Sequence, residues 1–149
     1  MLTRRLLLWL ATVTILIIAS ACETNKTAVG MTRDGHDGLV AVIKPCHADA
    51  AIFGLSVKTF ASQSIVWQIT SETGSHQRSF TLGSVPSGFK EIVPYSLQSL
   101  KGELQVDFHT SELPHDTANV DISQVQKGTI VVNGKQFSMD AFNARNTCG

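Results

Sequence analysis

The residues of this chain best suited to catalysis or metal binding are Cys46 and His47, which are adjacent in the sequence. A thiolate beside an imidazole can act as a nucleophile, and with further histidines it can bind a soft metal ion such as copper or zinc. Alternatively, Cys46 forms a disulfide and His47 is an exposed turn residue. We favour the second interpretation, because cysteines of exported domains usually pair and the N-terminus predicts export.

The other histidines do not complete a metal site in the sequence. The chain has five histidines, His36, His47, His76, His109 and His115. No two of them have the i, i+4 spacing of one helix face or the i, i+2 spacing of one strand face. We therefore predict no bound metal and no cofactor. Cys46 and His47 remain the ligands of an alternative hypothesis, a protein that handles copper or zinc outside the cytoplasm.

Serines, carboxylates and aromatic residues do not form a catalytic set either. The chain contains no Gly-x-Ser-x-Gly motif, and Ser75 and Ser84 follow glycines in turn-like segments. Trp67 is expected in the core, and Tyr95, which follows a proline, is expected to be exposed. We expect the carboxylates on solvated faces, namely Asp107, Glu112, Asp116 and Asp121. The sequence thus predicts no catalytic residues and a protein that is not an enzyme.

The N-terminus predicts both export and attachment to a membrane. Arg4-Arg5 precede the apolar run from Leu6 to Ile18, and Ala19-Ser20-Ala21 then precede Cys22. A short basic segment, a short apolar segment and small residues before a cleavage point are typical of a signal peptide. A cysteine directly after the small residues looks like a bacterial lipobox. We therefore predict that residues 1–21 are removed and that Cys22 carries the lipid.

Other interpretations of this segment share most of its residues. Ala19-Ser20-Ala21 also fits ordinary signal peptidase, which would release the protein, and an uncleaved anchor is a further alternative. Arg4-Arg5 permit twin-arginine export as well as general secretion. The cysteine count favours lipidation, because the chain has three, Cys22, Cys46 and Cys148. Lipidation of Cys22 leaves one pair for a disulfide, whereas simple secretion leaves an unpaired thiol.

Length and charge limit the remaining possibilities. Removal of residues 1–21 leaves 128 of the 149 residues, enough for one compact domain. That part keeps ten of the twelve basic residues and all twelve acidic ones, so it lacks the clustered positive charge of nucleic-acid binding. The polar segment 22–38 is predicted to be a flexible tether and residues 39–149 the folded domain. The expected partners are the membrane, through the Cys22 lipid, and an envelope protein or small ligand.

The folded part is predicted to be all β with one short helix at its end. Alternating apolar residues are clearest around Trp67 and over the run from Leu104 to Phe108, and Asn133-Gly134 is a strong hairpin signal. Ser138 can cap a helix over residues 139–146, with Phe142 facing the sheet. The predicted strands cover residues 39–43, 52–59, 64–70, 78–82, 89–93, 102–110, 118–122, 129–132 and 136–138.

The chain resembles a broad group of small actinobacterial-type lipoproteins with no assigned activity. The residues that carry this resemblance are Ala19-Ser20-Ala21-Cys22, Pro45-Cys46, Trp67-Gln68-Ile69, the segment from Leu82 to Phe89, and the ending from Phe142 to Cys148. The resemblance implies an Ig-like β-sandwich on a tether, a cysteine pair joining the first strand to the C-terminus, and a place in the bacterial envelope. It implies no activity. We therefore expect a lipid-anchored, non-enzymatic binding or interaction module.

Overall fold

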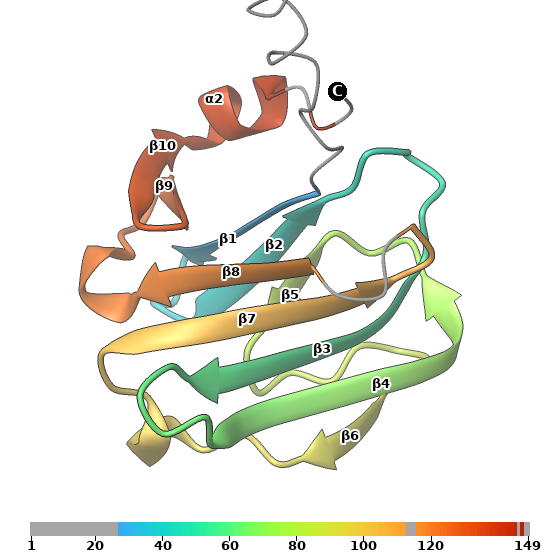
Figure 1. Ribbon diagram of the computed structural model, residues 1–149, viewed down its shortest axis with the longest axis horizontal. Helices are drawn as coiled ribbons and strands as arrows, with labels where there is room; N and C mark the ends of the chain where they lie inside the picture. Colours follow the sequence, from blue (N-terminus) through green and yellow to red (C-terminus); the bar gives the residue numbers. More distant parts are fainter. Residues whose placement is uncertain (1–26, 113–115, 146, 148–149) are drawn as a thin grey trace, which may run out of the picture.

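The computed structural model describes residues 27–112, 116–145 and 147, which form two antiparallel five-stranded sheets (Figure 1). The first sheet contains, in spatial order, β10 (Lys135–Ser138), β9 (Thr129–Val132), β1 (Ala28–Arg33), β2 (Leu39–Lys44) and β5 (Ser79–Thr81). The second contains β6 (Lys90–Val93), β4 (Ile65–Ser75), β3 (Ile52–Thr59), β7 (Glu103–Thr110) and β8 (Asp116–Asp121). Two 3₁₀ turns, η1 (Leu97–Ser99) and η2 (Ile122–Gln124), and the helix α2 (Met139–Ala144) complete the described elements.

This architecture confirms the predicted all-β sandwich. The pairings β1-β2-β5 and β3-β7-β8 correspond to the A-B-E and C-F-G pairings of an immunoglobulin sandwich. The hairpin of β9 and β10 extends the first sheet beyond that pattern. Its turn has positive φ at Asn133 and Gly134, as the sequence predicts for a tight hairpin.

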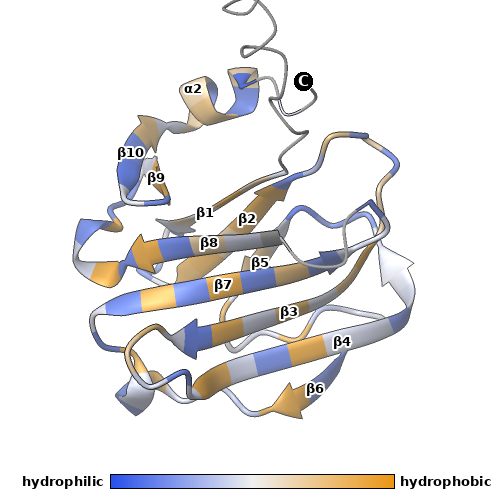
Figure 2. Cartoon of the chain, in the orientation of Figure 1, coloured by the Kyte–Doolittle hydropathy of each residue, from blue (hydrophilic) through white to orange (hydrophobic). Residues whose placement is uncertain are grey.

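Alternation along the strands separates the core from the outer face of the second sheet. On β7, Leu104, Val106 and Phe108 are fully buried, as the sequence predicts, and the ribbon alternates between apolar and polar residues (Figure 2). On β4 the expected alternation, with Ile65, Trp67 and Ile69 inward and Val66 outward, is wrong at two positions, because Ile65 is exposed and Val66 is buried. The register shifts between Val57 and Lys58 of the neighbouring β3, so Ile65 is 40% exposed although Trp67 and Ile69 are buried.

The largest correction concerns the predicted tether. Residues 28–33 are not part of a flexible linker but form β1, which pairs with β2 over its whole length, from Ala28↔Lys44 to Arg33↔Leu39. Val29 and Met31 face the main core, and Met31 is fully buried. The segment has only two large apolar residues, separated by Gly30, so its periodicity is too short to stand out in the sequence. The folded domain therefore includes residues assigned to 22–38.

Gly30 is required where β9 approaches β1. A Cβ at this position would lie 2.7 Å from the backbone oxygen of Val131 and 2.8 Å from Cγ1 of Ile130. Real Cβ atoms do not approach a backbone oxygen so closely, so only glycine fits without movement. The hairpin of β9 and β10 packs against β1 through this close contact.

The C-terminal helix forms where the sequence predicts it. The Ser138 hydroxyl accepts a hydrogen bond from the amide of Ala141 at 3.1 Å, which satisfies one free donor of the first turn. Asp140 lies in that turn, where the helix dipole favours negative charge. Phe142 is buried in a second cluster with Ala28, Ile130 and Val132. α2 ends at Ala144, two residues before the predicted end.

Candidate functional site

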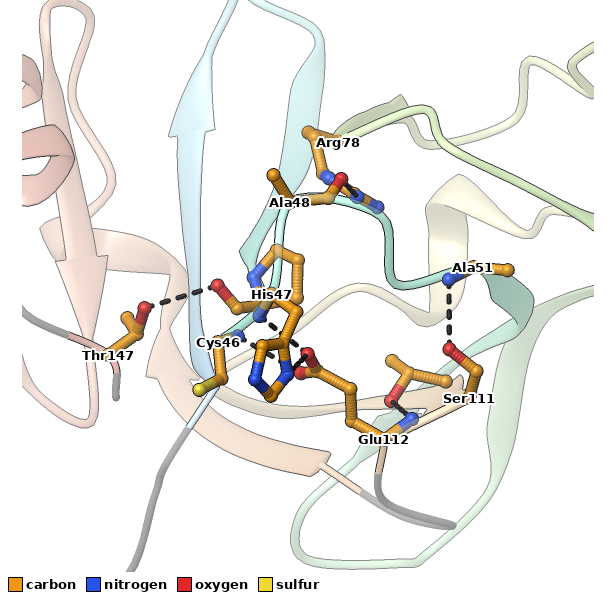
Figure 3. Close-up of polar contacts among 10 residues, drawn as sticks. Cys46, His47, Ala48, Ala51, Arg78, Ser111, Glu112 and Thr147 are labelled. Atoms are coloured by element: carbon orange, nitrogen blue, oxygen red, sulfur yellow. Dashed lines mark hydrogen bonds and ion pairs between the residues drawn. The ribbon is translucent and has the colours of Figure 1, made fainter. Parts of the chain in front are cut away.

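Cys46 and His47 lie in the loop between β2 and β3, at one end of the sandwich (Figure 3). Pro45 directly follows β2 and lacks an amide hydrogen, so it ends the strand. Cys46 is half-buried, whereas the His47 side chain is 70% exposed. The loop therefore carries a sheltered sulfur and a solvent-facing imidazole on adjacent residues.

The carboxylate of Glu112 holds this loop. Glu112 lies just after β7, which belongs to the second sheet. One oxygen accepts a hydrogen bond from the Cys46 amide at 3.0 Å. The other accepts from the His47 amide at 2.5 Å and lies 2.7 Å from His47 Nδ1. The Glu112 side chain is only 14% exposed. The prediction of a solvated Glu112 is therefore wrong, and this carboxylate satisfies two loop amides and the imidazole together.

Two further contacts fix the rest of the loop. Nη2 of Arg78 donates to the backbone oxygen of Ala48 at 2.7 Å, and the amide of Ala51 donates to Oγ of Ser111 at 3.0 Å. Partial burial lowers the pKa of Arg78 below its ordinary value, although the nearby charges of Glu112 and Asp49 oppose the shift. The guanidinium stays charged and adds a positive group beside the Glu112 carboxylate.

The C-terminal segment lies against the start of the same loop. The hydroxyl of Thr147 donates to the backbone oxygen of Pro45 at 3.1 Å, and Thr147 is buried. Nζ of Lys44 donates to the backbone oxygens of Asn143 and Arg145, the latter at 2.5 Å. Cys148 lies outside the described residues, so its pairing with Cys46 stays a prediction.

The donor atoms around Cys46 form a compact group. The sulfur of Cys46, a ring nitrogen of His47 and a carboxylate oxygen of Glu112 all lie within 4.8 Å of one another. Sulfur, imidazole nitrogen and carboxylate oxygen are ligands that zinc accepts. Sequence reasoning found the first two residues and missed Glu112. No local signal marks it, because 65 residues separate it from His47 and only the pairing of β3 with β7 places it there.

The remaining histidines lie elsewhere in the described part of the chain. His36, His76 and His109 are exposed and do not join the group around Cys46. His109 lies on the outer face of β7, with its ring centroid 5.9 Å from that of Phe53. His115 lies outside the described residues.

Trp67 and Tyr95 both belong to the core region. Trp67 is fully buried, as predicted, and its Nε1 donates to Glu91 at 3.0 Å. Tyr95 is not the exposed aromatic that the sequence predicts. Its ring packs edge-on against Trp67 at 6.4 Å and fills the space beside Gly83, and burial raises the pKa of its phenol. Neither ring lines an open groove.

Comparison of the chain with protein-family models, curated proteins and solved structures found no match. In the part of the chain that the structure describes, no helix has the length and apolar character needed to cross a bilayer.

Proposed function

We propose that this protein is a lipid-anchored, non-enzymatic binding module of the bacterial envelope. The observation that carries the proposal is the engagement of Glu112. Both of its oxygens accept hydrogen bonds from the segment of Cys46 and His47. The most reactive part of the chain is therefore held as a structural loop. A carboxylate that already accepts from backbone amides is poorly placed to act as a general base.

The position of β1 supports anchoring close to the membrane. Five residues separate Cys22 from Ala28, the first residue of β1. A chain of this length spans at most about 20 Å when fully extended. A lipid on Cys22 would therefore hold the sandwich at the membrane surface, with the Ala28 end of β1 toward the bilayer.

A disulfide between Cys46 and Cys148 is the second part of the proposal. The Thr147–Pro45 hydrogen bond brings the residue before Cys148 to the residue before Cys46. In Figure 3 the sulfur of Cys46 lies on the side of Thr147. In the chain-entropy description, a bond closing a loop of about 100 residues stabilises a domain by up to about 4.7 kcal/mol. Such a bond would secure the C-terminal segment outside the cell.

Phase partitioning tests the anchor. Wild-type protein from native membranes should enter the detergent phase, and the Cys22→Ser variant should move to the aqueous phase, because two or more acyl chains are needed for stable attachment. Detergent-phase recovery of both proteins, with residues 1–21 still present in the wild type, would indicate an uncleaved signal, and aqueous recovery of both would indicate simple secretion. Either result would overturn the proposed anchor.

The compact donor group supports one second candidate, a metal-handling protein that uses Cys46, His47 and Glu112. The two candidates differ in their response to zinc and copper. A metal ligand set predicts a melting temperature that rises with metal concentration and a weaker rise in Glu112→Gln. The binding module predicts the same melting temperature with and without either metal.

A further inference from the structure

We infer that the protein binds one unit of a neutral saccharide in a hollow on the outer face of the second sheet. This inference rests on the proposed function as a binding module and names the class of its ligand. The hollow has a volume of about 210 Å³ and lies over the middle of β3, β4 and β7. Its outward-facing lining consists of Gly54, Ser56, Gln68, Thr70, Asp107 and His109.

The hollow exists because Gly54 has no side chain at the centre of this face. Gly54 pairs with Thr70 of β4 on one side and with His109 of β7 on the other. Its φ is not positive, and a Cβ would lie 3.3 Å from the Ile69 oxygen and 3.8 Å from the His109 Cβ. Neither backbone strain nor a severe clash requires glycine here. Strand glycines mark either bulges or places where a ligand or another backbone approaches closely, and Gly54 lies at a bulge that faces the hollow.

A bulge next to Gly54 places the ring of Phe53 against His109, one of the lining residues. The register of β3 shifts between Ile52 and Gly54 on both of its neighbours. The ring of Phe53 lies over Gly74 of β4, where a Cβ would be 3.0 Å from it, and its centroid is 5.9 Å from that of His109. Bulges are common next to binding sites because they redirect side chains. Phe53 does not line the hollow itself, but it packs against His109, whose ring gives the hollow an aromatic edge for the C–H face of a sugar.

The polar lining supplies both donors and acceptors without net charge. Asp107 is paired with Lys58 at 2.6 Å and also accepts from Gln105 at 2.9 Å and Thr117 at 2.8 Å. The Lys58–Asp107 pair has no net charge, so the hollow favours neither an anionic nor a cationic ligand. A neutral ligand with several hydroxyls matches such a surface, because each hydroxyl both donates and accepts.

Ser56 adds a hydrogen-bonding group that the protein itself does not use. Its hydroxyl oxygen is buried at the wall of the hollow and has no partner among the described residues. The oxygen has almost no exposed surface, so a ligand hydroxyl can reach it only if the Ser56 side chain rotates into the hollow. The amide of Gln68 lies on the neighbouring strand, opposite Ser56 in the register. Gln68, Thr70 and Asp107 line the same hollow and present polar groups to it.

Saturation-transfer NMR on the full chain in detergent tests the inference. The probes are glucose, galactose, mannose and N-acetylglucosamine, with glucose 6-phosphate as the anionic comparison. We expect transfer to at least one neutral sugar and weaker transfer to the phosphate. Gly54→Val, which fills the hollow, and Gln68→Leu, which removes the amide, should each weaken binding at least tenfold. Thr73→Val, on an exposed position of β4 outside the hollow, should bind as the wild type does.

Several results would overturn the inference. The first is the absence of saturation transfer to all four sugars. The second is preferential binding of glucose 6-phosphate. The third is wild-type affinity in both Gly54→Val and Gln68→Leu at an unchanged melting temperature. The second variant keeps the test valid if the first does not fold. A free sugar and an envelope polysaccharide present the same chemistry, and competition of bound monosaccharide by isolated wall polysaccharide separates them. Loss of sugar binding with intact membrane partitioning would reject this inference and leave the anchor standing.

Discussion

At the scale of single residues, Glu112 holds the loop around Cys46 through three hydrogen bonds. Its carboxylate accepts from the backbone amides of Cys46 and His47, one at each oxygen. We expect Glu112→Ala to lower the free energy of unfolding by about 1.5–3 kcal/mol, because hydrogen bonds to a charged acceptor are the stronger kind. Urea unfolding with an unchanged slope measures this loss.

The control for Glu112→Ala is His47→Ala, which removes the imidazole that contacts Glu112. His47 is 70% exposed, so the loss of its side chain should cost less than about 1 kcal/mol. A cost of His47→Ala equal to that of Glu112→Ala would contradict the assignment of Glu112 to the backbone amides. It would place the energetic weight on the His47–Glu112 pair instead.

A second residue-scale prediction concerns Asp107 and pH. Partial burial acts to raise the pKa of its carboxyl, but hydrogen bonds from Lys58, Gln105 and Thr117 outweigh it, so the pKa lies below its ordinary value. The folded pKa is therefore below the unfolded value of about 3.9. The stabilisation by Asp107 is complete above that value and is lost as pH falls through the folded pKa.

The comparison of Asp107→Asn with the wild type measures this effect. The variant should be less stable at neutral pH, and the difference should shrink below about pH 4. Glu72→Gln is the control, because the Glu72–Lys90 pair is 82% and 74% exposed and should contribute little at any pH. A constant difference for Asp107→Asn between pH 7 and pH 2.5 would contradict the argument.

At the scale of elements, Gly30 decides whether the β9–β10 hairpin can pack against β1. We expect Gly30→Ala to destabilise the protein by about 1–3 kcal/mol, since its Cβ would meet a backbone oxygen that cannot move away independently. Gly35→Ala is a suitable control, because a Cβ there meets no atom within 4 Å and should change stability by under about 0.5 kcal/mol. Equal thermal shifts for both variants would show that the close approach is not required.

The elements that sequence reasoning predicted correctly are those with local signals. Asn133-Gly134 set a hairpin turn, Ser138 capped a helix, and the alternation from Leu104 to Phe108 fixed the inward face of β7. β1 was missed because its short apolar pattern gains meaning only from the six pairs it makes with β2. Ile65 was misplaced because the bulge that exposes it lies in the pairing with another strand.

At the scale of the whole molecule, the sandwich brings distant segments together in ways that no local pattern contains. Glu112 reaches Cys46 because β7 runs beside β3, and Thr147 reaches Pro45 across 102 residues. The saccharide hollow likewise depends on the register of three strands around Gly54. Residue types in the sequence could suggest Cys46 and His47, but only the topology shows which groups accompany them.

The central claim is that Cys22 carries the membrane anchor and that Cys46 and Cys148 form a disulfide beneath a structural loop. The most direct measurement is intact mass, with and without thiol alkylation, of the protein purified from its native envelope. We predict a chain that begins at Cys22, carries added acyl mass, and takes up no alkylating reagent before reduction and two equivalents after it. An unlipidated chain, or an alkylatable Cys46 before reduction, would contradict the account, and the free thiol would favour metal chemistry at Cys46, His47 and Glu112.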